Sequence, residues 1–206
     1  MTVASHYDGS ASTYADQYNE EKIWTNEEYP ANFFRLKLVR NLLSEVGAKS
    51  VYEHGVGDAT PLVAVGSDGI RIAGNDVSPE MVKYAKANME SHGFDPEAIA
   101  FLDVQDTNAI AVERERAGEF DAVMALGVIP HVTDDHDFVA SMDAFLRPGG
   151  TMLLQFRNSM FSMFTFNRLT KEFILEDLLV DAPASVRKVV TADLDGRLAV
   201  DKPPMR

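Results

Sequence analysis

Residues 51–59, Val-Tyr-Glu-His-Gly-Val-Gly-Asp-Ala, combine a short apolar strand with an acidic residue and a turn that holds two glycines. Glycine lacks a Cβ atom and tolerates positive φ, so a ligand can approach the backbone of such a turn closely. Glu53 and Asp58 flank the turn, and Asp76 and Asp103 close the next two predicted strands. Because these carboxylates would repel a diphosphate, the pattern predicts a nucleoside site for a ligand with cationic groups.

The composition of the chain is that of an ordinary globular protein. Its 206 residues suffice for one domain with a full core and are too few for two comfortable ones. The chain is 46% hydrophobic and 25% charged, which is typical of soluble domains. It has no cysteine, which excludes disulfides, cysteine-based zinc sites and thiol nucleophiles.

The formal net charge of -13 restricts the partners. Proteins that bind DNA or RNA without sequence preference neutralise phosphates with Lys and Arg, so an acidic chain argues against nucleic acid. The same charge disfavours an anionic membrane surface. Residues 1–8 lack the features of a secretory signal, and no apolar run approaches the roughly 20 residues that span a bilayer. We expect a cytoplasmic protein that acts on a small molecule.

Strand and helix patterns alternate from residue 50 onward. The predicted strands cover residues 50–54, 70–75, 99–103, 120–126 and 151–156. Helices are predicted over residues 60–65 and 134–145. Another helix begins at residue 79, and a charged helix after the third strand ends at residue 116. A turn is expected at residues 147–150. Strands separated by helical patterns indicate βαβ units and a parallel sheet. Since such crossovers are right-handed, we predict a doubly wound α/β fold.

The two ends of the chain flank this core, and we expect one domain over residues 1–206. Residues 1–47 are predicted to form a helical lid, with one loose helix at 10–23 and a second over 30–43. The cofactor-binding core covers residues 48–158. Residues 159–206 are expected to form a short or atypical cap, with a helix over 169–180 and a small hairpin over 186–201 around Asp195-Gly196.

Glu53, Gly55 and Gly57 are the first candidate contacts. S-adenosylmethionine suits them, because it carries a sulfonium and an ammonium. Gly55 and Gly57 would lie under its amino-acid portion, and Glu53 would face the ammonium directly or through water. The alternative is an ordinary strand-to-helix turn, since such glycine pairs are common.

Asp76 is the candidate partner of the ribose. A carboxylate at the end of the second strand can accept two hydrogen bonds from a ribose diol, as acids at this position also do in NAD sites. Val77 and Met81, which follow it, complete this part of the predicted cofactor pocket. The alternative role of Asp76 is a helix cap, but Ser78 already suits that role.

Asp103 and Val104 are expected to flank the adenine, with the acid accepting from the exocyclic amine. Asp106 competes with Asp103 for this role, because predicted strand ends are uncertain by a few residues. Asp103 as a solvated turn acid is the other interpretation.

The end of the fourth strand is where methyl donor and acceptor should meet. Leu126 and Gly127 are predicted cofactor contacts. His131 is a candidate general base, because its pKa falls near working pH, although a lone histidine beside an apolar strand is more often a packing residue. His54 is expected to form a wall of the cofactor pocket. The histidines lack the spacing of a metal site, so no metal is predicted.

Aromatic residues near both ends of the chain are candidates for closing the site. Tyr14 and Tyr18 could lie over it, where an aromatic face attracts a sulfonium through a cation–π interaction; they could equally pin a helix to the sheet. Residues 160–166 are rich in Met and Phe and are interpreted as core or a lid edge, with an acceptor pocket as the alternative.

With these residues in place, the chain resembles the class I S-adenosylmethionine-dependent methyltransferases of small molecules. VYEHGVGDAT at residues 51–60 is similar to their first motif, and GNDVSPEMVKYAK at 74–86 is similar to their second-strand acidic motif. FDAVMALGVIPHV at 120–132 and FLRPGGTMLLQ at 145–155 resemble their fourth and fifth strands, and residues 7–18 resemble their lid helix. The resemblance covers about half of the chain and implies a seven-stranded Rossmann-like sheet and in-line methyl transfer.

Two features depart from the family pattern. Ala59 replaces the third glycine of the first motif, which is tolerable because that position needs only a small side chain. After residue 158 the chain leaves little room for the helix and two strands that the family adds.

Two rival functions remain. The first is a non-catalytic module that kept the cofactor pocket, and the second is an NAD-dependent oxidoreductase, which Thr60 disfavours because it replaces the last glycine of the dinucleotide motif.

Overall fold

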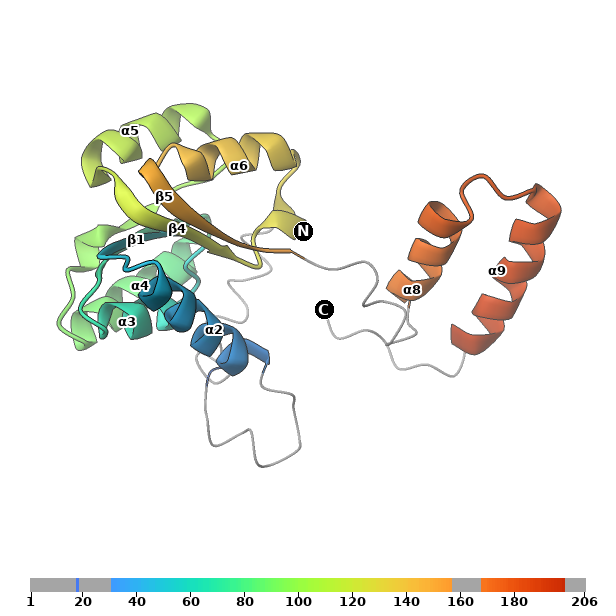
Figure 1. Ribbon diagram of the computed structural model, residues 1–206, viewed down its shortest axis with the longest axis horizontal. Helices are drawn as coiled ribbons and strands as arrows, with labels where there is room; N and C mark the ends of the chain where they lie inside the picture. The colour runs from blue at the N-terminus through green and yellow to red at the C-terminus, as the bar shows by residue number, and fades with distance from the viewer. Residues whose placement is uncertain (1–17, 19–30, 157–167, 199–206) are drawn as a thin grey trace. The chain divides into compact units, whose positions relative to one another are not determined.

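The computed structural model describes Tyr18 and residues 31–156 and 168–198. The chain divides into two compact units, residues 1–156 and 157–206. The boundary lies close to the predicted end of the cofactor-binding core. All the strands of the described residues belong to the first unit (Figure 1).

The first unit is built around a parallel five-stranded sheet in the order β3-β2-β1-β4-β5. The strands are β1 (Ser50–His54), β2 (Arg71–Asp76), β3 (Ile99–Phe101), β4 (Phe120–Leu126) and β5 (Leu146–Gln155). The chain moves outward from β1 to β3 and then returns to place β4 on the other side of β1. This reversal between β1 and β4 is where open α/β sheets bind ligands.

Helices cover both faces of the sheet, which confirms the doubly wound fold (Figure 1). One face carries α2 (Ala31–Glu45), α3 (Thr60–Gly66) and α4 (Pro79–Ser91), and the other carries α5 (Thr107–Ala117) and α6 (Asp135–Asp143). Two short 3-10 turns, η3 (Pro96–Ala98) and η4 (Ile129–His131), precede β3 and α6. The strands are therefore buried on both faces, as in most parallel sheets.

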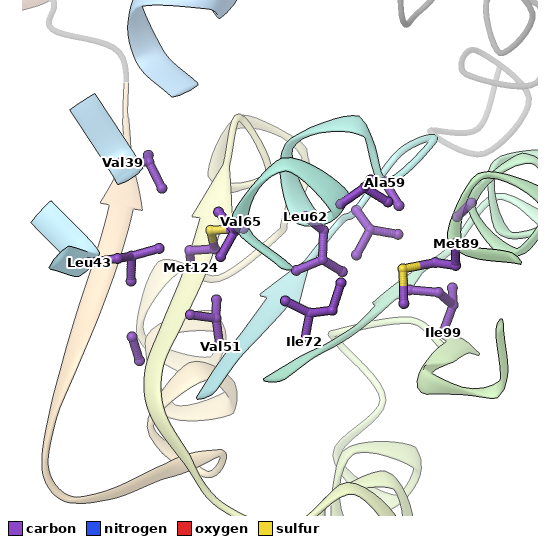
Figure 2. Close-up of a cluster of buried hydrophobic side chains, with 14 of the residues drawn as sticks. Val39, Leu43, Val51, Ala59, Leu62, Val65, Ile72, Met89, Ile99 and Met124 are labelled. Atoms are coloured by element: carbon purple, nitrogen blue, oxygen red, sulfur yellow. The ribbon is translucent and has the colours of Figure 1, made fainter. Parts of the chain in front are cut away.

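The core under α2, α3 and α4 is aliphatic (Figure 2). Figure 2 shows the side chains that α2, α3, α4 and the strands contribute to it, among them Val39, Leu43, Val51, Leu62, Val65, Ile72, Met89 and Met124. Leu43, Val51, Leu62 and Val65 are completely inaccessible to solvent. Burial of side chains of this size stabilises a fold by about 1.5–3 kcal/mol each.

The core under α5 and α6 is aromatic. Tyr52 of β1 stacks on Phe145 with ring centroids 4.1 Å apart and meets the edge of Phe120 at 5.2 Å. Tyr52 also donates a hydrogen bond of 3.4 Å to the buried Glu113. Both carboxylate oxygens of Glu113 accept hydrogen bonds from Arg116. Successive residues of β1 thus enter two chemically different cores, because strand side chains alternate between faces.

Local signals set most of the element bounds. Ser78 caps α4 by accepting from the Met81 N–H, and Pro79 occupies the first helical position, as the sequence predicts. The predicted bounds of β1 and β4 are those of the structure. Strand β5 differs, because residues 147–150, predicted as a turn, lie within it. A register shift opposite residues 120–122 accommodates them.

The second unit is helical in its described part. It contains α8 (Arg168–Phe173), the π-helical turn η6 (Ile174–Leu178) and α9 (Ala184–Leu198). The helix predicted over 169–180 is confirmed through Leu178, but the hairpin predicted over 186–201 is wrong, since α9 covers residues 186–198. Lys171 pairs with Asp195 at 2.5 Å, so the expected turn residue instead links two helices. A two-stranded hairpin alone would be marginally stable.

The described helices include none with the length and apolar character needed to cross a membrane. The predicted N-terminal helix at 10–23, apart from Tyr18, and the Met- and Phe-rich residues 160–166 lie outside the described residues.

Candidate functional site

The carboxyl ends of β1, β2 and β4 bring the candidate residues of the core together. Glu53 lies opposite Gly74 of β2 and Met124 of β4, and His54 lies opposite Asn75 and Ala125. The glycine turn after β1 therefore begins beside the end of β2. This arrangement places Asp76 next to the turn.

The turn after β1 requires its glycines for two separate reasons. Gly55 and Gly57 have φ values of 69° and 55°, a left-handed conformation that other residues rarely adopt. A Cβ atom on Gly55 would also lie 2.4 Å from Cγ2 of Val128. The Gly55 and Val56 N–H groups donate to the Asn75 carbonyl at 2.8 and 3.0 Å, which fixes the turn against β2. Ala59, the third small residue, is buried and also left-handed, with φ 61°.

Glu53 is a buried carboxyl group without a full set of partners. Only 1% of the residue is exposed, and its Oε2 has no hydrogen-bond partner among the described residues. Burial raises the pKa of Glu53 well above its ordinary value, Arg35 lowers it, and the carboxylates of Asp58 and Asp76 raise it again. A cationic ligand would relieve this unfavourable burial of negative charge.

Asp76 joins the glycine turn to the start of α4. Its Oδ2 accepts from the Gly57 N–H at 2.9 Å, and its Oδ1 accepts from the Ser78 N–H at 2.9 Å. Each carboxylate oxygen can accept two hydrogen bonds, so these backbone contacts are compatible with a ribose diol. Val77 is half-buried beside it, whereas Met81 is completely buried.

Asp103 and Asp106 have different surroundings. Asp106 caps α5 by accepting from the N–H groups of Asn108 and Ala109. Asp103 is exposed, and its side chain accepts a local hydrogen bond of 3.0 Å from the Gln105 N–H. Asp106 is thus engaged in the helix cap, while Asp103 lies beside the half-buried Val104.

Three predicted site residues lie at the end of β4 or just after it, namely Leu126, Gly127 and His131. Leu126 is half-buried and packs against the aliphatic core, and Gly127 has a φ of 86°. His131 lies in η4, is exposed, and its backbone N–H donates to the Val128 carbonyl at 2.9 Å. Its side chain is therefore accessible from solvent at the ligand end of the sheet.

His54 lies in the aromatic core. It has no exposed surface, its ring lies 5.3 Å from those of Tyr52 and Phe145, and its Nδ1 is 2.7 Å from Oδ1 of Asn75. Burial lowers the pKa of His54 to about 4, against the opposing effects of Asn75 and the Ser141 backbone. This environment favours a structural role over the predicted role as a pocket wall. Of the predicted site residues, Tyr14 lies outside the described part of the chain.

Arg35 is a further candidate site residue, which the sequence patterns did not predict. It donates to Oε1 of Gln155 at 2.7 Å and to the hydroxyl of Tyr18 at 2.6 Å, and it lies 5.8 Å from the Tyr18 ring centroid. A Cβ on Gly127 would lie 3.9 Å from Arg35, which places the guanidinium at the end of β4.

Sequence spacing holds one signal for Arg35. It precedes the buried Val39 by four residues and so shares the inner face of α2. Its Nε is buried and has no hydrogen-bond partner among the described residues. Arg35 thus provides a positive charge close enough to act on Glu53 of the acidic turn.

The described residues contain no group of three or more His, Asp or Glu side chains that could hold a metal ion.

Comparison with known proteins extends these observations. The profile of a family described as a methyltransferase domain matches residues 52–154, half of the chain. The ubiquinone biosynthesis O-methyltransferase of Methylocella silvestris is 32% identical over 117 residues, which cover 57% of this chain and 42% of that protein. Its counterpart in Xanthomonas axonopodis pv. citri is 28% identical over 143 residues, covering 69% and 57%. The chain thus spans about half the length of the curated relatives it matches.

Solved structures share the fold. An S-adenosylmethionine-dependent methyltransferase from Thiobacillus denitrificans in complex with S-adenosyl-L-homocysteine aligns with a TM-score of 0.51 at 18% identity, over 75% of this chain and 55% of that one. Magnesium protoporphyrin IX methyltransferase from Synechocystis PCC 6803 with bound SAH aligns with a TM-score of 0.54 at 15% identity, over 70% and 66%. These identities support a common architecture.

Proposed function

Because the chain belongs to the methyltransferase-domain family of class I S-adenosylmethionine-dependent enzymes, we propose that it transfers a methyl group from S-adenosylmethionine to a small-molecule acceptor. The observation that carries the proposal is the buried Glu53, whose Oε2 has no partner among the described residues and which borders a turn with glycines in the left-handed conformation. A buried carboxylate of this kind suits a cation.

The amino-acid portion of the donor is zwitterionic, and two side chains match its charges. Glu53 would accept from the ammonium, while Arg35 would donate to the carboxylate through its buried Nε. Arg35 opposes the raised pKa of Glu53, so the two side chains interact electrostatically. The left-handed turn at Gly55 and Gly57 leaves the backbone open to the chain that connects these charged groups.

The nucleoside portion would lie along the ends of β2 and β3. Asp76 would accept from the ribose hydroxyls, while Asp103 would accept from the exocyclic amine of adenine, with Val104 and Val77 as apolar neighbours. Met81 is completely buried, so we assign it a supporting role without direct contact to the donor.

When bound, S-adenosylmethionine supplies an electrophilic methyl group on a good leaving group. The contribution of the protein is then chiefly to orient the reacting groups, an effect worth roughly 7–11 kcal/mol in well-oriented intramolecular reactions. An acceptor that arrives protonated needs a group that takes its proton. His131 is the candidate, because its exposed side chain follows β4.

The acceptor atom is proposed from the curated relatives. Both are named O-methyltransferases of ubiquinone biosynthesis, which favours oxygen over nitrogen. The net charge of -13 supports a small molecule over nucleic acid.

Two rivals predict different binding results. An NAD-dependent oxidoreductase would need a pyrophosphate beside Asp58, a buried acid that borders the glycine turn. A non-catalytic module would bind the donor without turnover. Calorimetric titration with S-adenosylmethionine and with NAD separates the first rival, and release of S-adenosylhomocysteine in a panel of hydroxylated acceptors separates the second.

Two substitutions test the assigned roles in the same titration. Asp76→Ala should weaken donor binding about 100-fold or more, because it removes charge-assisted hydrogen bonds to the ribose. His131→Ala should leave donor affinity nearly unchanged and lower only turnover. Wild-type affinity in the Asp76 variant would remove the cofactor assignment.

A further inference from the structure

Two buried polar side chains connect the ends of three strands. His54 is the last residue of β1 and Asn75 the penultimate residue of β2, and their side chains are 2.7 Å apart. Asn75 also donates from Nδ2 to the carbonyl of Leu102, the residue after β3, at 3.2 Å. His54 and Asn75 are each 1% exposed or less.

The hydrogen-bond pattern fixes the proton on His54. A carbonyl only accepts, so Asn75 must turn its amide nitrogen toward Leu102 and its Oδ1 toward His54. Nδ1 of His54 must therefore carry the hydrogen. Burial lowers the pKa of His54 to about 4, which keeps the ring neutral near pH 7 and consistent with this single donor.

Each member of this connection immediately precedes a proposed ligand contact. Gly55 follows His54, Asp76 follows Asn75, and Asp103 follows Leu102. We propose that the hydrogen-bonded pair His54–Asn75 fixes the positions of the glycine turn, Asp76 and Asp103 relative to one another. The inference rests on the proposed function, because it assumes that these three positions bind one ligand.

The side chains add a restraint that the backbone ladder lacks. Strand β3 ends at Phe101, so the chain that leads to Asp103 has already left the sheet. Beyond the ladder, the Leu102 N–H still donates to the Asp76 carbonyl at 3.0 Å. The Asn75 amide secures the other side of Leu102. In a buried region these hydrogen bonds are costly to leave unmade, so the pair restricts the positions the loop can adopt.

A general contribution to folding is the alternative explanation, and matched variants at position 54 distinguish the two. Asn places a donor where Nδ1 of His lies but leaves a cavity, whereas Leu fills more of the space and provides no donor. If the pair positions the site, ligand affinity should depend on whether residue 54 donates a hydrogen bond. If the pair only stabilises the fold, ligand affinity should fall with the stability that each variant loses.

The experiment is a calorimetric titration of the full chain with S-adenosylhomocysteine at a temperature where circular dichroism shows each variant folded. We expect His54→Leu and Asn75→Leu to bind about tenfold more weakly than wild type, the effect of one or two lost hydrogen bonds. His54→Asn should retain affinity within about threefold. Met142→Ala, at a fully buried position of the aromatic core, should lower the melting temperature without weakening binding.

The outcomes separate this inference from the function beneath it. Absence of binding by the wild type would overturn the proposed function and the positioning role together. Wild-type binding with equal affinities for His54→Leu and His54→Asn would overturn the positioning role alone. The same conclusion would follow if Met142→Ala weakened binding as much as Asn75→Leu.

Discussion

Glu53 must be ionised to attract an ammonium group, yet its surroundings favour the protonated form. Burial is the largest cause of its raised pKa, and Asp58 and Asp76 add to it. The native state therefore holds this proton more tightly than the unfolded chain does. Its contribution to stability is present at acidic pH and is lost as pH rises from the ordinary glutamate pKa through the raised one.

The first prediction concerns Glu53→Gln, which removes this titration. The ligand-free variant should be more stable than wild type at neutral pH, because a neutral amide does not have to be buried as a charge. Its affinity for S-adenosylmethionine should fall. In wild type, affinity should rise with pH through the raised pKa, because only the ionised carboxyl attracts the ammonium.

Thermal melting and calorimetry in buffers of different ionisation enthalpy measure both effects, since binding should release a proton. Glu45→Gln, at an exposed position of α2, is the control and should change neither. A Glu53→Gln variant that is less stable without ligand would contradict the assignment of Glu53 as an uncompensated buried acid.

At the scale of elements, α2 carries two arginines with different environments. Arg35 faces the end of β4, whereas Arg40 forms a bidentate pair with Asp68 at the surface. Exposed pairs of that kind contribute about 0–1 kcal/mol.

The second prediction compares Arg35→Met with Arg40→Met. The first should weaken donor binding about tenfold or more, since a hydrogen bond to a charged group is worth about 1.5–3 kcal/mol, and the second should leave it unchanged. Titration with S-adenosylhomocysteine and with its decarboxylated analogue provides the measurement. Arg35→Met should reduce affinity for the first ligand and not for the second; equal losses for both would argue against carboxylate recognition.

The turn between β1 and α3 supports a third prediction, on Gly55→Ala. Alanine costs roughly 1–2 kcal/mol in a left-handed conformation, and the contact with Val128 adds about 1–3 kcal/mol of overpacking. Gly69→Ala is the matched control, because Gly69 has a φ of 81° with no atom within 4 Å of a built Cβ. Chemical denaturation should show the larger loss for Gly55→Ala. Equal losses would mean that Val128 moves aside without cost.

At the scale of the whole molecule, the described site residues all belong to the first compact unit. The fourth prediction is that a fragment of residues 1–156 folds and binds S-adenosylmethionine with nearly the affinity of the full chain, because both hydrophobic clusters of the core lie within this unit. Circular dichroism and calorimetry on the fragment test this. A fragment that folds but does not bind would show that residues 157–206 contribute to the donor site.

Local patterns were sufficient for the sheet and for the acids at its edge. The sequence patterns of β1 and β4 predict the bounds that the structure has. Glu53 and Asp76 are recognisable in the sequence as carboxylates at the ends of strands. Arg35 and Asn75 were missed because their importance depends on neighbours distant in sequence, Gln155 and Leu102. The turn signal of Asp195-Gly196 misled for the same reason, since packing of α9 overrides a local preference.

Ala59 has one further consequence for ligand binding. Alanine is strained at a positive φ, so the structure that packs around the fully buried Ala59 must hold the loop in this one conformation. The loop is therefore preorganised: its conformational entropy is lost when the chain folds and not when a small molecule arrives. Affinity at this end of the sheet then reflects contacts made, with little subtracted for ordering the backbone.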